Sequence, residues 1–159
     1  MPVAMKPPPW KCATCRERDV WPITLDYQTE IEHDGRPYAI DLPGLPVKRC
    51  GHCGTIVPND EADEKIYDAL RRAAGLLHPN QIRQYRESFG MTQRELARFL
   101  QVAESTLSRW ETGAQIQQRA MDKLLRGFFE VPEFRRFLQR HDSTSVNAAT
   151  SGSAAELRI

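Results

Sequence analysis

The sequence predicts an α+β protein of two domains, for three reasons. Four cysteines occur as two C-x-x-C pairs. The stretch between the pairs alternates apolar and polar residues around Asp34-Gly35, which is typical of an antiparallel β-hairpin. From residue 76 onward the apolar residues recur at helical spacing. We therefore expect a metal-binding domain with a connecting helix over residues 10–75, an all-α domain over 76–141 and a disordered tail over 142–159.

The cysteine pairs predict a closed metal site. Each pair can give two thiolates to a tetrahedral ion, and four thiolates are typical of structural zinc. We expect one structural Zn²⁺ per chain, contributing on the order of 10 kcal/mol to the folding of a small zinc ribbon. A thioredoxin-like redox pair is the alternative for either C-x-x-C taken alone. The expected ligands are Cys12, Cys15, Cys50 and Cys53.

A β-hairpin is expected between the two cysteine pairs. Asp34-Gly35 is a strong turn signal, and apolar residues alternate with polar ones on both sides of it. The alternating residues are Ile23, Leu25, Tyr27, Thr29 and Ile31 before the turn, and Tyr38, Ile40 and Leu42 after it.

Two helices should follow the second cysteine pair. The first is capped near Asn59 and is stopped by Gly75. The second is opened by Pro79 and ends at Gly90. We expect the second helix to turn three residues toward the core of the C-terminal domain: Ile82, Tyr85 and Phe89.

Residues 91–113 predict two short helices joined by a tight break. Thr92 and Glu95 form a T-x-x-E capping box, so a helix should begin at Gln93. After Gln101-Val102, a second helix is expected from about Glu104 to Glu111. The residues expected to face the core are Leu96, Ala97, Phe99, Leu100, Leu107 and Trp110.

The outward side of the second short helix suits a DNA major groove. Small polar side chains allow close approach, and the Arg109 guanidinium can donate two bonds to guanine. An ordinary helical hairpin with a solvated face is the alternative. We expect base contacts from Ser105, Thr106 and Arg109, close approach to the DNA at Ser108, and phosphate contacts from Gln93, Arg94 and Arg98.

Two further helices are expected, over residues 117–129 and 132–139, with Pro132 at the break between them. They contain more large apolar residues than a domain of this size easily buries. A homodimer binding a palindromic operator would use that surface, and extra monomer core is the alternative. The expected dimer residues are Leu124, Leu125, Phe128, Phe134, Phe137 and Leu138.

Charge is distributed unevenly along the chain. Residues 26–68 contain ten acidic and four basic residues, whereas residues 82–126 contain eight basic and five acidic ones. The basic part suits a polyanion, and the acidic part suits a basic protein. No apolar run reaches the length of a membrane helix and no signal peptide is evident, so we expect a cytosolic protein without a membrane partner.

The order capping box, two-residue break and Ser108-Arg-Trp-Glu-x-Gly113 resembles the lambda-repressor-like, XRE-type helix-turn-helix family. The chain departs from that family's pattern in two places. Gln101 stands where a turn glycine is usual, and Ala103 stands where a capping Ser or Asp is usual.

Residues 10–140 as a whole are similar to the MqsA-type antitoxins, which join a YgiT-type zinc finger to a helix-turn-helix. The cysteine pairs, Leu107 to Gly113, Lys123 to Arg126 and Pro132-Glu-Phe134 carry this similarity. It implies a type II antitoxin whose zinc domain neutralises a ribonuclease toxin and whose C-terminal domain dimerises and represses its own operon. It also implies base contacts at Ser105 and Arg109. Serine replaces the family's asparagine, so the family's operator sequence does not carry over.

The alternative function is a stand-alone regulator without a toxin. Its zinc domain would only support dimerisation or recognise another partner. The sequence contains no Ser/His/Asp set, no acidic pair and no open metal site, so we expect no enzyme activity.

Overall fold

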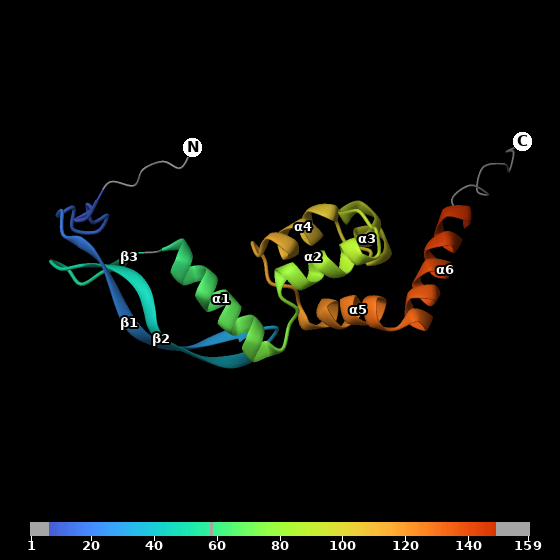
Figure 1. The fold of residues 1–159 in the computed structure, drawn as a ribbon, viewed down its shortest axis with the longest axis horizontal. Helices are drawn as coiled ribbons and strands as arrows, with labels where there is room; N and C mark the ends of the chain where they lie inside the picture. Colours follow the sequence, from blue (N-terminus) through green and yellow to red (C-terminus); the bar gives the residue numbers. More distant parts are fainter. Residues whose placement is uncertain (1–6, 58, 149–159) are drawn as a thin grey trace, which may run out of the picture. The chain divides into compact units, whose positions relative to one another are not determined.

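The computed structural model describes residues 7–57 and 59–148, with side chains up to residue 141. The chain divides after Gly75 into two compact units, here called the N-terminal and C-terminal units. The N-terminal unit contains an antiparallel hairpin with four close cysteines, and the C-terminal unit is helical (Figure 1). The predicted α+β fold class is confirmed.

A three-stranded antiparallel sheet forms the N-terminal unit. Strands β1 (Val20–His33), β2 (Arg36–Cys50) and β3 (Ile56–Val57) lie in the order β1-β2-β3. The turn between β1 and β2 places Asp34 at φ 51° and Gly35 at φ 68°. Aspartate and glycine tolerate this left-handed backbone, which matches the twist of the strands.

A β-bulge keeps the apolar side chains of β2 on one face. Leu25 pairs with Leu45 and Tyr27 with Leu42, so Pro43 and Gly44 together stand opposite Asp26. Gly44 adopts φ 67° and donates its backbone N–H to Asp26 Oδ1 at 2.9 Å. The extra residue reverses the alternation of β2. As a result the buried β2 residues on either side of the bulge share a face, namely Ile40, Leu45 and Val47.

Helix α1 (Asp60–Ala74) packs against this face of the sheet (Figure 1). Asn59 caps its start by accepting the Glu61 N–H, and Gly75 ends it at φ 66°. Ala62 is buried among Leu45, Val47 and the half-buried hairpin residues. Both predicted ends of this helix are confirmed.

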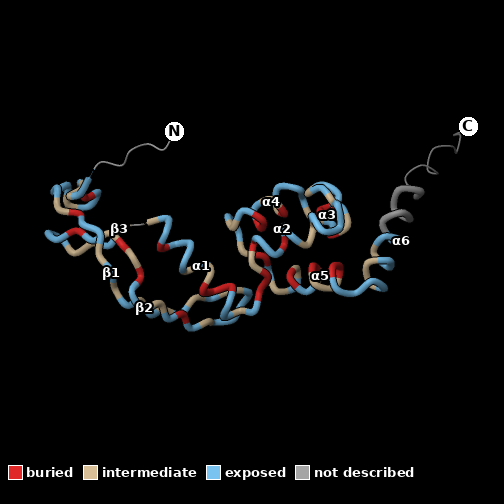
Figure 2. The backbone as a smooth tube through the Cα atoms, in the orientation of Figure 1, coloured by how far each residue is buried: buried red, intermediate tan, exposed pale blue. Residues whose placement is uncertain are grey.

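Among the residues that the structure describes, the C-terminal unit has five helices: α2 (Pro79–Ser88), α3 (Gln93–Phe99), α4 (Glu104–Thr112), α5 (Arg119–Glu130) and α6 (Pro132–Ala148). Figure 2 shows the buried residues of α5 on one side of that helix. They complete a core whose most buried large members are Leu77, Ile82, Leu96, Leu107, Leu125 and Phe128. None of the helices within the described part of the chain is long and apolar enough to cross a membrane.

Three expectations for this unit are wrong in detail. Phe89, expected in the core, is 40% exposed; its ring lies at the edge of the core, stacked on Phe129 with centroids 5.9 Å apart. Helix α5 begins at Arg119, and Gln117 is a buried residue before it. Helix α6 continues to Ala148, so the expected disorder does not hold for residues 142–148. The rest of that predicted tail, 149–159, lies outside the described residues.

The approach of α5 to α6 depends on Gly127. A Cβ at this position would lie 2.9 Å from the ring of Phe134, so only glycine lets this ring lie so close to α5. Arg135 caps the end of α5 by donating from Nη1 to the carbonyl oxygens of Phe128, at 2.9 Å, and Phe129, at 3.3 Å. These contacts fix the first turns of α6.

Candidate metal centre and nucleic-acid interface

The four cysteines converge at one end of the hairpin. Their Sγ atoms all lie within 4.8 Å of one another, with 3.7 Å between Cys12 and Cys53 and 3.6 Å between Cys15 and Cys50. A tetrahedral ion with bonds of about 2.3 Å to sulfur holds its ligands roughly 3.8 Å apart. A disulfide would need about 2.0 Å. The cluster could therefore hold one metal ion.

The two C-x-x-C segments fold in the same way. In each, the first cysteine N–H donates to a carbonyl five residues later: Cys12 to Glu17 at 2.8 Å, and Cys50 to Thr55 at 3.0 Å. The carbonyl of that cysteine accepts an N–H four residues later, from Arg16 at 3.0 Å or from Gly54 at 2.9 Å. Both donors have left-handed backbones, with φ 66° at Arg16 and 74° at Gly54. Two matched turns thus present two sulfurs each to one point.

Hydrogen bonds give the thiols different acidities. The hydrogen bond between Cys53 and Thr55, at 3.2 Å, lowers the pKa of Cys53 to about 6. A backbone hydrogen bond with Glu17 lowers the pKa of Cys15, but burial and the neighbouring thiols outweigh it and raise the pKa to about 12. A metal ion requires deprotonated sulfur, so its binding would release the protons of these thiols.

Apolar residues enclose the cysteines on one side, whereas Cys53 is exposed. Cys12 and Cys50 are buried with Val20, and Trp10 packs against them. A side chain at Gly51 would press on the Asp19 carboxylate, which would have to move. Four sulfurs and an apolar wall leave no coordination position for a substrate, as in structural rather than catalytic metal sites.

The predicted helix-turn-helix is present with its expected irregularities. Thr92 Oγ1 accepts the Glu95 N–H at 3.2 Å, and Glu95 Oε2 accepts the Thr92 N–H at 2.7 Å, which completes the capping box. Gln101 occupies the left-handed region at φ 55°. Ala103 caps α4 without any side-chain hydrogen bond. The turn between α3 and α4 therefore forms without its usual glycine and capping residue.

Helix α4 has a buried face and an outward face. Leu107 and Trp110 are buried, which confirms their predicted core role. On the outward face Ser105 and Arg109 are exposed at i, i+4 spacing. Thr106 and Ser108 are half-buried, whereas Arg94 and Arg98 of α3 are exposed. An exposed guanidinium beside small hydroxyl side chains is compatible with a helix lying in a groove.

Glu111 is a key residue of this unit that the sequence analysis missed. It is 2% exposed and accepts from Arg86, with Nε at 2.7 Å and Nη2 at 3.0 Å. Gln93 Nε2 also donates to Glu111 at 2.9 Å, so the carboxamide expected at a phosphate already has a partner inside the protein. A signal was present: Glu111 lies four residues after Leu107, on the core side of the helix, and buried carboxylates need partners.

The structure divides the expected dimer residues. Leu125 and Phe128 are 0% exposed in a single chain, so their assignment to a dimer surface is wrong; they are core residues packed beneath α2–α4. Phe137 is 46% exposed, and its ring stacks on Phe134 with centroids 6.4 Å apart. Leu124 and Leu138 are half-buried against the core.

A model of the helix-turn-helix family matches residues 82–133 of this chain. No match to this chain was found among curated proteins. Among solved structures, the crystal structure of Putative DNA Binding Protein NE0471 from Nitrosomonas europaea ATCC 19718 is similar at 12% identity. The alignment covers 68% of this chain and 86% of that one, with a TM-score of 0.36, which is too low to establish a shared fold. The family match and the outward face of α4 together support a DNA-binding regulator.

Proposed function

We propose that this protein is the antitoxin of a type II toxin–antitoxin system and represses its own operon as a DNA-binding dimer. The observation that best supports DNA binding is the outward face of α4, where Arg109 is exposed above a fully buried Leu107. Arg109 and Leu107 both lie within residues 82–133, the part of the chain that matches the helix-turn-helix family. Sequence similarity to MqsA-type antitoxins supports the more specific role.

In this proposal α4 enters the major groove. Arg109 donates two parallel bonds to a guanine, while Ser105, Thr106 and Ser108 contact neighbouring base edges. Arg94 and Arg98 neutralise phosphates, and the backbone at Gln93 approaches another phosphate. The Arg86–Glu111 pair joins α2 to α4 and so holds the recognition helix in a fixed orientation.

Two copies of the chain place their α4 helices on half-sites about 34 Å apart. Leu125 and Phe128 are core residues, so they cannot form the dimer interface. The exposed Phe137 is the strongest remaining candidate for its centre, and Phe134, Leu138 and Leu124 are candidates for its edge. An aromatic side chain exposed on a helix is a natural centre for such an interface.

The N-terminal unit would hold the toxin. Five acidic residues and one basic residue lie in the hairpin between residues 24 and 42, and this charge would speed the encounter with a basic ribonuclease. The outer edge of β1 adds backbone groups for strand pairing. One structural Zn²⁺, bound by Cys12, Cys15, Cys50 and Cys53, would hold the unit together.

A stand-alone regulator is the alternative, and co-expression distinguishes the two. A small basic protein encoded beside this chain should arrest growth when expressed alone and should be harmless when this chain is present. Replacing Glu30 and Glu32 by Lys should abolish the rescue, whereas Arg109→Ala should preserve it and lose only operator repression. A neighbouring product that is harmless alone would favour the stand-alone regulator.

A further inference from the structure

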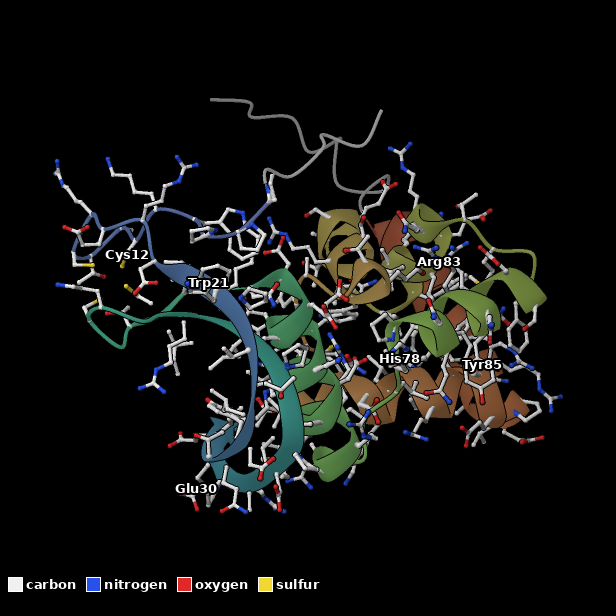
Figure 3. All side chains as sticks on the ribbon, turned by 60° about the vertical axis from the view of Figure 1, so that its left-hand side comes forward. Cys12, Trp21, Glu30, His78, Arg83 and Tyr85 are labelled. Atoms are coloured by element: carbon white, nitrogen blue, oxygen red, sulfur yellow. The ribbon has the colours of Figure 1, made fainter. Side chains whose placement is uncertain are left out.

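The two ends of the hairpin have opposite charge. The metal end, defined as residues 10–21 and 48–57, contains two acidic residues and five basic ones: Lys11, Arg16, Arg18, Lys48 and Arg49. The turn end, residues 24–42, contains five acidic residues and one basic one. Figure 3 shows Cys12 and Trp21 at one end of the hairpin and Glu30 at the other. A basic partner suits the turn end and would be repelled by the metal end.

Trp21 is an exposed aromatic residue within the metal end. Its side chain is 45% exposed, although tryptophan normally buries most of its surface in a core. Its indole Nε1 donates to Asp19 Oδ1 at 2.8 Å, which fixes the ring in place. The ring therefore faces solvent in a fixed orientation. Binding a ligand would cost this side chain little conformational entropy.

A basic residue, Arg49, stands across the strands from Trp21. Arg49 is the register partner of Trp21 across β1 and β2, and directly paired residues project from the same face of a sheet. Ile56 of β3 pairs with Arg49 and is 51% exposed, so the three residues form a row across the three strands. A hollow of about 280 Å³ beside this row is lined by Trp21, Ile23, Arg49, Cys50 and Gly51.

A second cation and indole lie together elsewhere on the metal end. Lys48 Nζ stands 4.6 Å from the ring centre of Trp10. Lys48 precedes Arg49 in β2, so the two cations project to opposite faces of the sheet. The exposed Lys11, Arg16 and Arg18 extend the positive charge along the neighbouring loop.

We propose that the metal end binds single-stranded nucleic acid. Proteins that bind single strands combine a basic track for phosphates with aromatic rings on which bases stack, and both are present here. Trp21 would stack on one base, and Arg49 with Lys11 and Arg18 would contact the adjacent phosphates. A single strand is favoured over a duplex because an indole face reaches a base only when that base is unstacked. This surface belongs to the N-terminal unit, whereas the proposed DNA face of α4 belongs to the C-terminal unit.

The test uses full-length, metal-loaded protein and a fluorescein-labelled oligothymidine of twelve nucleotides, followed by anisotropy. Trp21→Ala should weaken binding about tenfold or more because base stacking is lost, and Trp21→Phe should retain most of it. Arg49→Ala should weaken binding and reduce the salt slope by about 0.7. Arg36→Ala, which removes a positive charge from the turn end, is the matched control and should bind like wild type.

Arg109→Ala separates this surface from the helix-turn-helix. It should weaken binding to duplex DNA and leave oligothymidine binding unchanged. Metal content and circular dichroism establish that each variant is folded; should Trp21→Ala lose metal, the exposed pair Lys11→Glu and Arg18→Glu replaces it as the deciding variant. The proposal is overturned if wild type fails to bind oligothymidine, if the deciding variant binds it like wild type, or if Arg109→Ala abolishes the binding.

Discussion

Arg86 and Glu111 form a two-point ion pair between α2 and α4, with Nε to Oε1 at 2.7 Å and Nη2 to Oε2 at 3.0 Å. The Glu111 side chain is 0% exposed and that of Arg86 is 11% exposed. Arg86 Nη1 also donates to the Met91 carbonyl oxygen at 2.7 Å, and Gln93 donates to the same carboxylate. One buried carboxylate thus connects α2, the start of α3 and the end of α4.

Replacing Glu111 by Gln should destabilise the C-terminal unit by roughly 3–5 kcal/mol, because the largely buried charge of Arg86 would lose its two-point carboxylate partner. Urea unfolding followed by the fluorescence of the buried Trp110 measures this. Glu87→Gln is the control: Glu87 also contacts Arg86, at 3.5 Å, but its side chain is 59% exposed, so the expected cost is below about 1 kcal/mol. Equal effects of the two changes would contradict this account.

The same pair should make stability depend on pH. Burial raises the pKa of Glu111, but hydrogen bonds from Arg86 and Gln93 outweigh it and leave the pKa below its ordinary value. A depressed folded-state pKa contributes stability above the unfolded value of about 4.3 that is lost as pH falls through the folded value. Unfolding curves between about pH 5 and pH 2 should show this loss, and Glu111→Gln should flatten it.

A better cap at Ala103 should stabilise α4. Ala103 has an extended backbone at φ −67° and ψ 142° but gives no side-chain hydrogen bond to the helix. Ala103→Ser should supply one to an N–H of the first turn and add about 1 kcal/mol to the free energy of unfolding. Thermal unfolding of the C-terminal unit measures the gain. Ala103→Val cannot accept the bond, and a gain with valine would refute the capping explanation.

Loss of the metal should unfold only the N-terminal unit. Cys50 is 0% exposed and its sulfur lies 3.6 Å from that of Cys15. Cys50→Ser should therefore release the metal and melt the sheet, while residues 79–140 stay folded and competent for DNA. Metal analysis and circular dichroism give the readout, with His52→Ala as a control that should keep its metal. Wild-type metal content in Cys50→Ser would refute the four-thiolate site.

The paired cysteine turns predict opposite effects at matched positions. Arg16 and Gly54 have the same left-handed backbone, which costs an L-residue about 1–2 kcal/mol and glycine almost nothing. Glycine also raises the entropy of the unfolded chain, which offsets part of this gain. The net effect of Arg16→Gly should be to stabilise the N-terminal unit by about 0.5–1 kcal/mol. Gly54→Ala should destabilise it by about 1 kcal/mol. Chelator-challenged unfolding compares them; two changes in the same direction would argue against this reasoning.

Arginine substitutions distinguish base contacts from phosphate contacts. Arg109→Ala should cost roughly 1–3 kcal/mol on the operator and relax the choice at one base pair. Arg98→Ala should weaken all sequences alike and reduce the salt slope by about one unit. Binding isotherms on specific and scrambled duplexes at several salt concentrations show the difference. If the Arg109→Ala protein still distinguished the specific duplex from the scrambled one as well as wild type does, Arg109 would not be a base-reading residue.

The sequence by itself determined the features that depend on local chemistry. The spacing of the cysteines predicted the cluster, Asp34-Gly35 predicted the turn, and Thr92 with Glu95 predicted the start of α3. The resemblance to the helix-turn-helix family placed Gln101 where a turn glycine is usual, and its backbone is left-handed at φ 55°. Each of these features involves a few neighbouring residues or a ligand set whose geometry is set by the ion, so the pattern is visible without the fold.

The tertiary structure decided the features that depend on which surfaces meet. Helical spacing placed Leu125 and Phe128 on an apolar face but could not tell a monomer core from a dimer seam, because both bury the same residues. Helical spacing placed Glu111 on the core side of its helix but could not identify the partner that makes its burial possible, because Arg86 lies 25 residues away. Trp21 and Arg49 became neighbours only through the register of β1 with β2. Pairings across such distances are chosen by the packing of the whole unit, which no short stretch of sequence contains.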